Sequence, residues 1–395
     1  MKDLLIEFNN SKILFSVVEF DAELNHQILH TEIVNTTFIE NGKISNFETA
    51  SKIIIENLIK IEKKFDRSFN NANLLLDHDN HFCINVSGYK KLNGSQITKE
   101  NISFILNSLK GLISENERDK TIIHIFNSKF NLDGNEIENL PIGLFGEFYT
   151  HNLSFILIDK YDHKNLISLL RKCNIKLKRV ILKSFTEGIE IIKKKRENKS
   201  FLKISIKKNK IKLLLFENSS LIFTQLFNFG SDIIFKDVSK VCSLSIETVI
   251  DILKENIFDN YIDKRNEEKH LDKKYFKNLN FRKISYPHIF NIIDARISEI
   301  SDIIFNKNIN VAYKKRMPIF LEIEDQVVFD SLKQTFKKSV LSEKVELVGK
   351  KNHNEHLINH SICLEVVSKG WDKEAIPIIQ SKKSIIARIF SSLFN

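Results

Sequence analysis

The sequence predicts an α/β protein built from two copies of a similar strand and helix plan. Its 395 residues are too many for one hydrophobic core. Apolar segments with a period of two alternate with segments of helical periodicity, as is typical of α/β folds. A β-hairpin followed by further strands and helices begins near residue 4 and again near residue 201, so we expect a duplication.

The first half is expected to open with a hairpin of strands 4–7 and 12–20, turned at Asn9 and Asn10. Thr98, with Glu100 behind it, opens a later helix, and Asp133-Gly134 marks a second turn. The other strands are expected at 28–34, 74–76, 82–86, 121–126, 129–133, 148–158 and 180–183. The helices are expected at 47–65, 96–108, 162–173 and 184–195.

The second half is expected to begin with the hairpin 201–206 and 211–216, followed by a strand at 221–229. A charged stretch at 259–277 interrupts the pattern. The remaining strands are expected at 318–322 and 362–367, and the helices at 232–241, 246–256, 286–305 and 325–338. Two halves that each open with a hairpin and continue as β-α-β indicate the duplicated actin/Hsp70 architecture.

Composition narrows the function classes. The net charge is +10, but basic residues are not interleaved with aromatic ones and no helix-turn-helix signal is present, so nucleic acid is not an expected partner. The surplus charge is better explained by solvated surface and by attraction to anionic lipid.

No apolar run is long enough to span a bilayer, and the chain starts in a strand pattern without a signal peptide. The four cysteines lack CxxC spacing, which suits reduced thiols in a cytoplasm.

The segment 381–395 is predicted to form an amphipathic helix that lies on a membrane. It is too short and too polar to span one. Its lysines could reach lipid phosphates while its apolar face enters the acyl boundary, although docking on the protein's own core is the alternative. The residues expected at the membrane are Lys382, Lys383, Ile385, Ile386, Arg388, Ile389, Phe390, Leu393 and Phe394.

Four segments of the chain stand out by their motifs and their order. They are the Pro-x-Gly-Leu-x-Gly motif at 141–146, the turn at 170–177 (with Asn174 where Gly is usual), the strand end at 227–233, and Arg296-x-x-Glu299-Ile300. Together these segments resemble the FtsA family, the bacterial actin-like cell-division proteins. The resemblance implies an actin/Hsp70-like two-lobed fold with duplicated ribonuclease-H-like domains and an inserted SHS2-type α+β subdomain. The implied limits are 1–81 with 159–198 for the first lobe, 82–158 for the insert, 199–378 for the second lobe (242–312 as its helical subdomain) and 379–395 for the membrane-targeting helix.

The same resemblance implies a function. Such a protein tethers FtsZ filaments to the cytoplasmic face of the inner membrane, assembles with itself into protofilaments, and works at the division site. The resemblance places the contact with the FtsZ C-terminal tail near Arg282, Arg296 and Glu299. The alternative for Arg296 and Glu299 is an ordinary surface ion pair at i, i+3.

The phosphate-binding hairpins depart from the family pattern. Gly-Thr-x-Lys is expected in the first hairpin, whereas Asn9-Asn10-Ser11-Lys12 stands there. In the second, 205–212 lacks both acids and all three glycines, and 321–324 replaces the Gly-Gly on the adenosine side. Glycine lets backbone N–H groups approach phosphate oxygens, and aspartate orders metal-bound water. Ser11, Lys12, Lys207 and Lys208 are therefore interpreted as remnant phosphate loops, and neither a cofactor nor ATP hydrolysis is expected.

Two alternatives stay open: an actin-like ATPase whose altered loops still bind ATP, and a pilus-type actin-like scaffold. The histidine-rich turn at 77–81 and the series His353, His356, His360 and Cys363 could suggest a metal. Both are interpreted as structural, the first because Asp and Asn are common in turns and the second because 362–367 has the pattern of a strand. No metal site and no catalytic residue are predicted.

Overall fold

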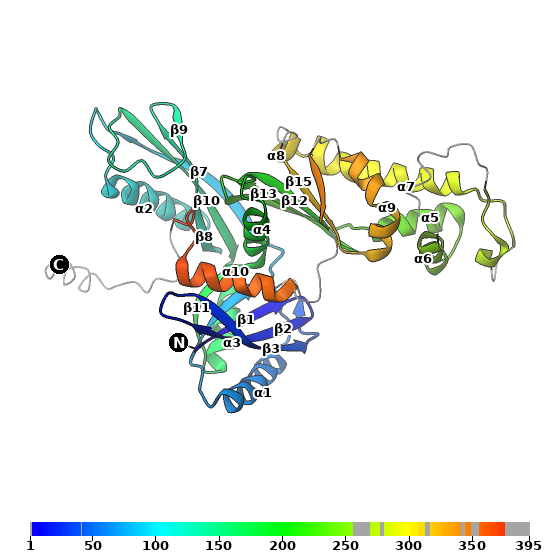
Figure 1. Ribbon diagram of the computed structural model, residues 1–395, viewed down its shortest axis with the longest axis horizontal. Coiled ribbons are helices and arrows are strands. Elements are labelled where there is room, and N and C mark those ends of the chain that lie inside the picture. Colours follow the sequence, from blue (N-terminus) through cyan, green and yellow to red (C-terminus); the bar gives the residue numbers. More distant parts are fainter. Residues whose placement is uncertain are drawn as a thin grey trace. The chain divides into compact units, whose positions relative to one another are not determined.

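The computed structural model describes residues 2–40, 42–255, 269–276, 280–312, 317–340, 344–348 and 355–375 (Figure 1). The chain forms two compact units. The first holds residues 2–199, 217–222 and the described residues from 355 onward. The second holds 200–216 and the described residues between 223 and 348. The predicted tail helix and His353 lie outside the described residues. Among the described helices, none combines the length and the apolarity needed to cross a bilayer.

The first unit is built on a five-stranded sheet. The strand order is β11-β6-β1-β2-β3, and β1 pairs antiparallel with β2 and parallel with β6. Helices α1 and α3 pack together, as do α4 and α10. The strands are β1 (Lys2–Asn9), β2 (Lys12–Phe20), β3 (His26–Asn35), β6 (Asn71–Leu76) and β11 (Lys176–Leu182), and the helices are α1 (Phe47–Phe65), α3 (Lys160–Lys172), α4 (Lys183–Lys194) and α10 (Glu355–Lys369).

A second sheet of the first unit is made by residues 82–159. The strands β7 (Phe82–Lys91), β10 (Phe148–Asp159), β8 (Lys120–Leu132) and β9 (Asn135–Ile137) are antiparallel in that order. Helix α2 (Lys99–Asn116) covers this sheet and buries Ile105, Leu109 and Ile113 against it. The two strands predicted at 121–126 and 129–133 are one strand, β8, because bulges in its pairing with β10 absorb the break.

The second unit repeats the strand order of the first. Its sheet runs β14-β13-β12-β15-β16, with an antiparallel hairpin beside two parallel strands. Since both units have this order, the predicted duplicated actin-like fold is confirmed. The strands are β12 (Phe201–Ile206), β13 (Ile211–Glu217), β14 (Ser220–Phe227), β15 (Ile319–Ile323) and β16 (Val345–Val348), and the helices include α5 (Asp232–Cys242), α6 (Ile246–Glu255), α7 (Tyr286–Ser301), α8 (Ile309–Ala312) and α9 (Gln326–Ser339).

Local sequence signals account for most element boundaries. The Asn46 side chain accepts a hydrogen bond from the Thr49 N–H and starts α1. Thr98 and Asn101 form a reciprocal capping box at α2. The first hairpin turns one residue later than predicted, because Asn9 pairs with Lys12 and leaves residue 10 and Ser11 in the turn. Ser11, the second residue of the turn, has a φ of 70° and so lies in the left-handed region.

The strand predicted at 362–367 is wrong, because these residues belong to helix α10. A short apolar run fits either a buried strand or a buried helix. Here Ile362, Cys363, Leu364 and Val366 are buried in the first unit, where α10 packs on α4 and β3. Helix α10 therefore belongs to the first compact unit. The domain limits implied by the resemblance placed it in the second lobe, within 199–378.

The segment that follows α10 is fixed to the open edge of β8. The Asn127 N–H donates to the Lys373 carbonyl at 2.7 Å, and the Ala375 N–H donates to the Ile125 carbonyl at 2.7 Å. The buried Glu374 carboxylate accepts a hydrogen bond from His124 Nδ1 at 2.9 Å and pairs with the Arg179 guanidinium. We call residues 371–375 the anchor segment.

Replacing Glu374 by Gln is expected to destabilise the first unit. Arg179 would keep a buried charge without its carboxylate, which costs about 3–5 kcal/mol in the free energy of unfolding. Urea unfolding followed by the fluorescence of Trp371, the single tryptophan of the chain, measures this loss. Asp372→Asn, at an exposed neighbouring position, is the control and should change stability by less than about 0.5 kcal/mol. Equal stability of the two variants would contradict the role given to Glu374.

Candidate functional site

The carboxyl ends of the parallel strands in the first unit bring charged side chains together. Glu7 lies near the end of β1, and Lys183 directly follows β11. Asp77 directly follows β6. In open α/β sheets this edge is where ligands bind, so it is the first place to look for a functional site.

Glu7 and Lys183 form a buried ion pair. Lys183 Nζ lies 2.8 Å from Glu7 Oε1, and the Glu7 side chain has no exposed surface. His360 Nε2, from α10, lies 2.7 Å from Glu7 Oε2. A carboxylate only accepts hydrogen bonds, so His360 Nε2 must carry a hydrogen. Both oxygens of Glu7 are therefore bonded to groups of the protein.

The hydrogen-bond chain continues beyond His360. Its Nδ1 lies 2.8 Å from the Ser16 hydroxyl on β2, which lies 2.7 Å from the Thr31 hydroxyl on β3. We call Glu7, Lys183, His360 and Ser16 the buried polar cluster. It joins β1, β2, α4 and α10 in the interior of one unit.

Electrostatics keep the ion pair charged. Burial opposes ionisation of Glu7, but the charge of Lys183 and the hydrogen bond from His360 outweigh burial and lower the Glu7 pKa to about 2. Burial likewise opposes the charge of Lys183, but Glu7 and Asp77 raise the pKa of Lys183 above its ordinary value. At neutral pH both groups are ionised.

This cluster is not among the predicted site residues, although the sequence contains a signal for it. Glu7 is an acid inside the apolar run Leu4–Phe8, and Lys183 follows the apolar run Val180–Leu182. A charged residue at the end of a buried strand needs a partner. Nothing local identifies that partner, because Glu7 and Lys183 are 176 positions apart.

The remnant phosphate loop predicted for the first unit lies in the β1–β2 turn. Its backbone is bonded within the unit, since the Ser11 carbonyl accepts from the Thr36 N–H at 2.7 Å. The Lys12 side chain is exposed. The Asn9 amide donates to Glu7 Oε1 at 3.2 Å, which links the turn to the buried polar cluster.

The remnant phosphate loop predicted for the second unit lies in the turn 207–210 between β12 and β13. The N–H groups of Ser231 and Asp232, at the start of α5, donate to the Lys207 and Lys208 carbonyls, each at 2.9 Å. Gly230 permits this approach, because a Cβ there would lie 2.1 Å from the Lys207 carbonyl oxygen. The turn thus presents carbonyl oxygens to its own unit.

The second unit has its own lysine–carboxylate pair. Lys203 on β12 lies 3.0 Å from Glu322 on β15, and its side chain is nearly fully buried. The Ser205 hydroxyl donates to Glu322 at 2.9 Å. Glu322 is therefore partly buried and paired within its own unit.

The predicted partner residues lie among α5 and α7. Arg296 on α7 pairs with Asp237 on α5 and, at 2.5 Å, with Glu299. The Arg282 guanidinium donates to the carbonyls of Cys242 and Ser243 at 2.8 and 3.0 Å, where α5 ends. Arg282 thus caps α5, and Arg296 joins two helices.

The two histidine-rich segments have structural contacts. His78 is buried and its Nε2 lies 3.2 Å from Asp162, while His81 Nδ1 donates to the His78 carbonyl at 2.8 Å. His360 is committed to Glu7 and Ser16. Among the described residues, no group of three metal-ligating side chains could hold an ion.

Lys183→Met is expected to destabilise the first unit by about 3–5 kcal/mol, because Glu7 would remain buried without its cation. Adding Glu7→Gln should recover part of that loss, which a double-mutant cycle measures.

The Glu7 pKa is lowered in the folded state, so the ionised carboxylate stabilises the first unit fully above pH 4.5, and this contribution is lost as the pH falls toward about 2. Urea unfolding at neutral and acid pH should show a shallower acid loss in Glu7→Gln than in the unaltered protein. Additive single-site effects would contradict the pairing.

Gly230→Ala is expected to destabilise the second unit by about 1–3 kcal/mol, because the new Cβ overlaps the 207–210 turn. Gly111→Ala is the matched control: it lies within α2, and its added Cβ meets no atom within 4 Å. That change should be neutral or stabilising by up to about 1 kcal/mol. Urea unfolding followed by circular dichroism separates the two, and a neutral Gly230→Ala would mean that the turn is loosely packed.

Comparisons with known proteins agree with this architecture. No family model matches the sequence. The cell division protein FtsA from Buchnera aphidicola subsp. Schizaphis graminum is 23% identical over 240 residues, and FtsA from subsp. Acyrthosiphon pisum is 22% identical over 240 residues. Each match covers 61% of this chain and 57% of the relative's length.

Among solved structures, the PilM-PilN type IV pilus biogenesis complex contains a chain that aligns with 94% of this chain and 98% of its own length. The TM-score is 0.51 and the sequence identity is 9%, a likeness that concerns the fold alone. The strand orders, the FtsA relatives and this likeness together lead to one conclusion: the chain is an FtsA-like protein with an actin-like fold.

Proposed function

We propose that this chain is a cell-division protein that tethers FtsZ filaments to the cytoplasmic face of the bacterial inner membrane at the division septum. The observation that carries the proposal is the similarity to two FtsA proteins over 240 residues. The actin-like fold and the basic amphipathic sequence at 381–395 agree with it.

The proposed mechanism is avidity. One short amphipathic helix binds lipid weakly and reversibly, with Phe390 and Phe394 in the acyl boundary and Lys382 and Lys383 at the phosphates. If the chains assemble side by side as an actin-like filament, many such helices act together, and the second and later contacts become intramolecular. Self-assembly is therefore part of the proposal.

ATP hydrolysis is not part of the proposal. In an actin-like ATPase, acids at this sheet edge would order metal-bound water, but here the oxygens of Glu7 are bonded to Lys183 and His360. The 207–210 turn carries Cβ atoms at each position and directs two carbonyls to the N–H groups of Ser231 and Asp232. These residues are a poor fit for nucleotide phosphates and for a metal ion.

The surface proposed for the FtsZ tail is the α5–α7 face near Arg282 and Arg296. An acidic peptide that binds there would compete with Asp237 and Glu299 for the Arg296 guanidinium, which is 30% exposed. Such an exchange of one carboxylate for another is compatible with weak, reversible binding. Arg296→Ala should therefore weaken FtsZ binding without changing lipid binding.

Co-sedimentation with anionic vesicles, with and without FtsZ filaments, tests the proposal. The full chain is expected to carry FtsZ to the vesicles in the absence of ATP, and a chain ending at Ser381 is expected to leave FtsZ in solution. Phe390→Ser keeps every cation of the tail, so weaker vesicle binding by this variant would assign the effect to the apolar face.

Three results would point elsewhere. Vesicle binding that survives removal of the tail would contradict the tether. Recruitment that needs ATP and is lost in Lys12→Ala would support the drifted ATPase. Normal lipid binding without FtsZ recruitment would contradict the adaptor function. It would favour the alternative of a pilus-type scaffold, which would be recruited through a peptide partner.

A further inference from the structure

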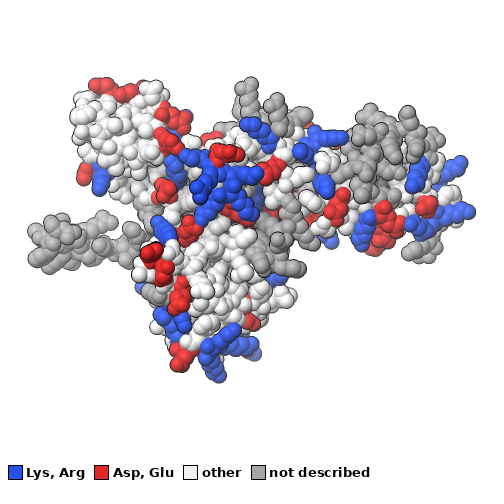
Figure 2. Space-filling model, viewed as in Figure 1, with Lys and Arg blue, Asp and Glu red and all other residues white. Residues whose placement is uncertain are grey.

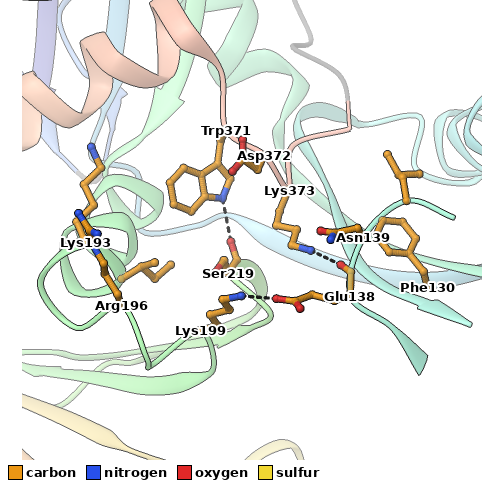
Figure 3. A pocket seen from close by; sticks show the side chains of 12 residues that line it. Phe130, Glu138, Asn139, Lys193, Arg196, Lys199, Ser219, Trp371, Asp372 and Lys373 are labelled. Atoms are coloured by element: carbon orange, nitrogen blue, oxygen red, sulfur yellow. Dashed lines mark hydrogen bonds and ion pairs between the residues drawn. The ribbon is translucent and has the colours of Figure 1, made fainter. Parts of the chain in front are cut away.

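A basic pocket lies within the first unit beside the anchor segment. Its volume is about 450 Å³, which is in the range of small-molecule sites. The residues that line it come from the end of α4 and the segment after it, from β8 and the loop after β9, from the β13–β14 turn and from the anchor segment (Figure 3). The charged members are Lys193, Arg196, Lys199, Lys373, Glu138 and Asp372.

Positive charge exceeds negative charge in this pocket, with four cations and two carboxylates. In Figure 2, Lys and Arg side chains gather in a dense patch over α4. The pKa of Lys373 is lowered, first by burial and then by the charge of Lys199. A region in which cations already repel one another attracts an anion.

The other cations in the pocket have partners, whereas Arg196 does not. Lys199 pairs with Glu138, Lys193 pairs with Glu365, and Lys373 donates to the Glu138 carbonyl at 2.8 Å. Within the part of the chain that the structure describes, Arg196 makes no hydrogen bond or ion pair and is exposed. Its guanidinium is available to bind an oxyanion by two parallel hydrogen bonds.

Trp371 forms one wall of the pocket and is held in place. Its indole N–H donates to the Ser219 carbonyl at 3.0 Å, and its ring packs edge-on against Phe185. Figure 3 shows Lys193 and Arg196 on one side of this ring and Glu138 and Phe130 on the other. A rigid aromatic wall beside a free guanidinium suits a ligand with one charged group and a small neutral part.

We infer that this basic pocket binds a small phosphate-bearing ligand, with Arg196 as the principal contact and Lys193 and Lys199 beside it. A phospholipid headgroup and a soluble phosphate ester share this chemistry. The headgroup is the favoured source, because the anchor segment lies a few residues before the predicted amphipathic helix at 381–395 and basic sites next to membrane segments attract anionic lipid. That preference rests on the proposed membrane function, whereas the phosphate site itself does not.

Trp371 is the only tryptophan of the chain, so its fluorescence reports on the pocket directly. Glycerol phosphate titrated into the full chain is expected to give a saturable change in emission, with a matching binding heat in calorimetry. Arg196→Ala should weaken binding about tenfold or more, because a charge-assisted bidentate contact is lost. Lys194→Ala is the matched control, because Lys194 is a nearby exposed cation that pairs with Glu190 and does not line the pocket.

The second arm uses vesicles of phosphatidylcholine with and without phosphatidylglycerol. A Trp371 response to phosphatidylglycerol that weakens in Arg196→Ala supports a lipid headgroup, and a response to glycerol phosphate alone supports a soluble ligand. The inference is overturned if neither emission nor heat responds to glycerol phosphate, if Lys194→Ala weakens binding as much as Arg196→Ala, or if only an acidic peptide binds. Because glycerol phosphate requires no membrane, failure of the tether and failure of the pocket are distinguishable.

Discussion

The buried ion pair between Glu7 and Lys183 is the interaction on which the first unit depends. Two charges removed from water cost several kcal/mol each unless every polar atom finds a partner. Here His360 and Ser16 complete the set, and they come from α10 and β2. The hydrogen bonds and the ion pair of the Glu7 carboxylate therefore hold together three elements that are far apart in the sequence: β1, the start of α4, and α10.

The second unit also contains a buried lysine that is paired with a carboxylate, but the residues differ from those of the first unit. Lys203 on β12 forms an ion pair with Glu322 on the neighbouring strand β15, and Ser205, which lies opposite Glu322, completes the bonding of the carboxylate. In both units the charge beside the first strand is neutralised by another side chain of the same unit. This internal neutralisation accords with a protein whose actin-like fold serves assembly and attachment, as proposed above, without nucleotide chemistry.

The anchor segment connects the interior of the first unit with its surface. Glu374 is buried with Arg179 and His124, whereas Lys373 and Trp371, one and three residues earlier, line the basic pocket. A turn at Asp372 and Lys373 separates the two sets of side chains, and the Glu374 N–H closes it by donating to the Trp371 carbonyl at 2.8 Å. The same five residues can therefore be held by the core and still contribute to a binding surface.

The sequence by itself determined the elements and their repetition. The cap at Thr98, the hairpins and the apolar periodicity all act over a few residues, so the periodicity predicted α1 to the residue and the repeated hairpins predicted the duplication. The tertiary structure decided what local patterns leave open. The run 362–367 became a helix because the surface between α4 and β3 buries it. Glu7 and His360 are 353 positions apart and form a hydrogen bond because tertiary packing brings β1 and α10 together. No short-range sequence pattern encodes that packing.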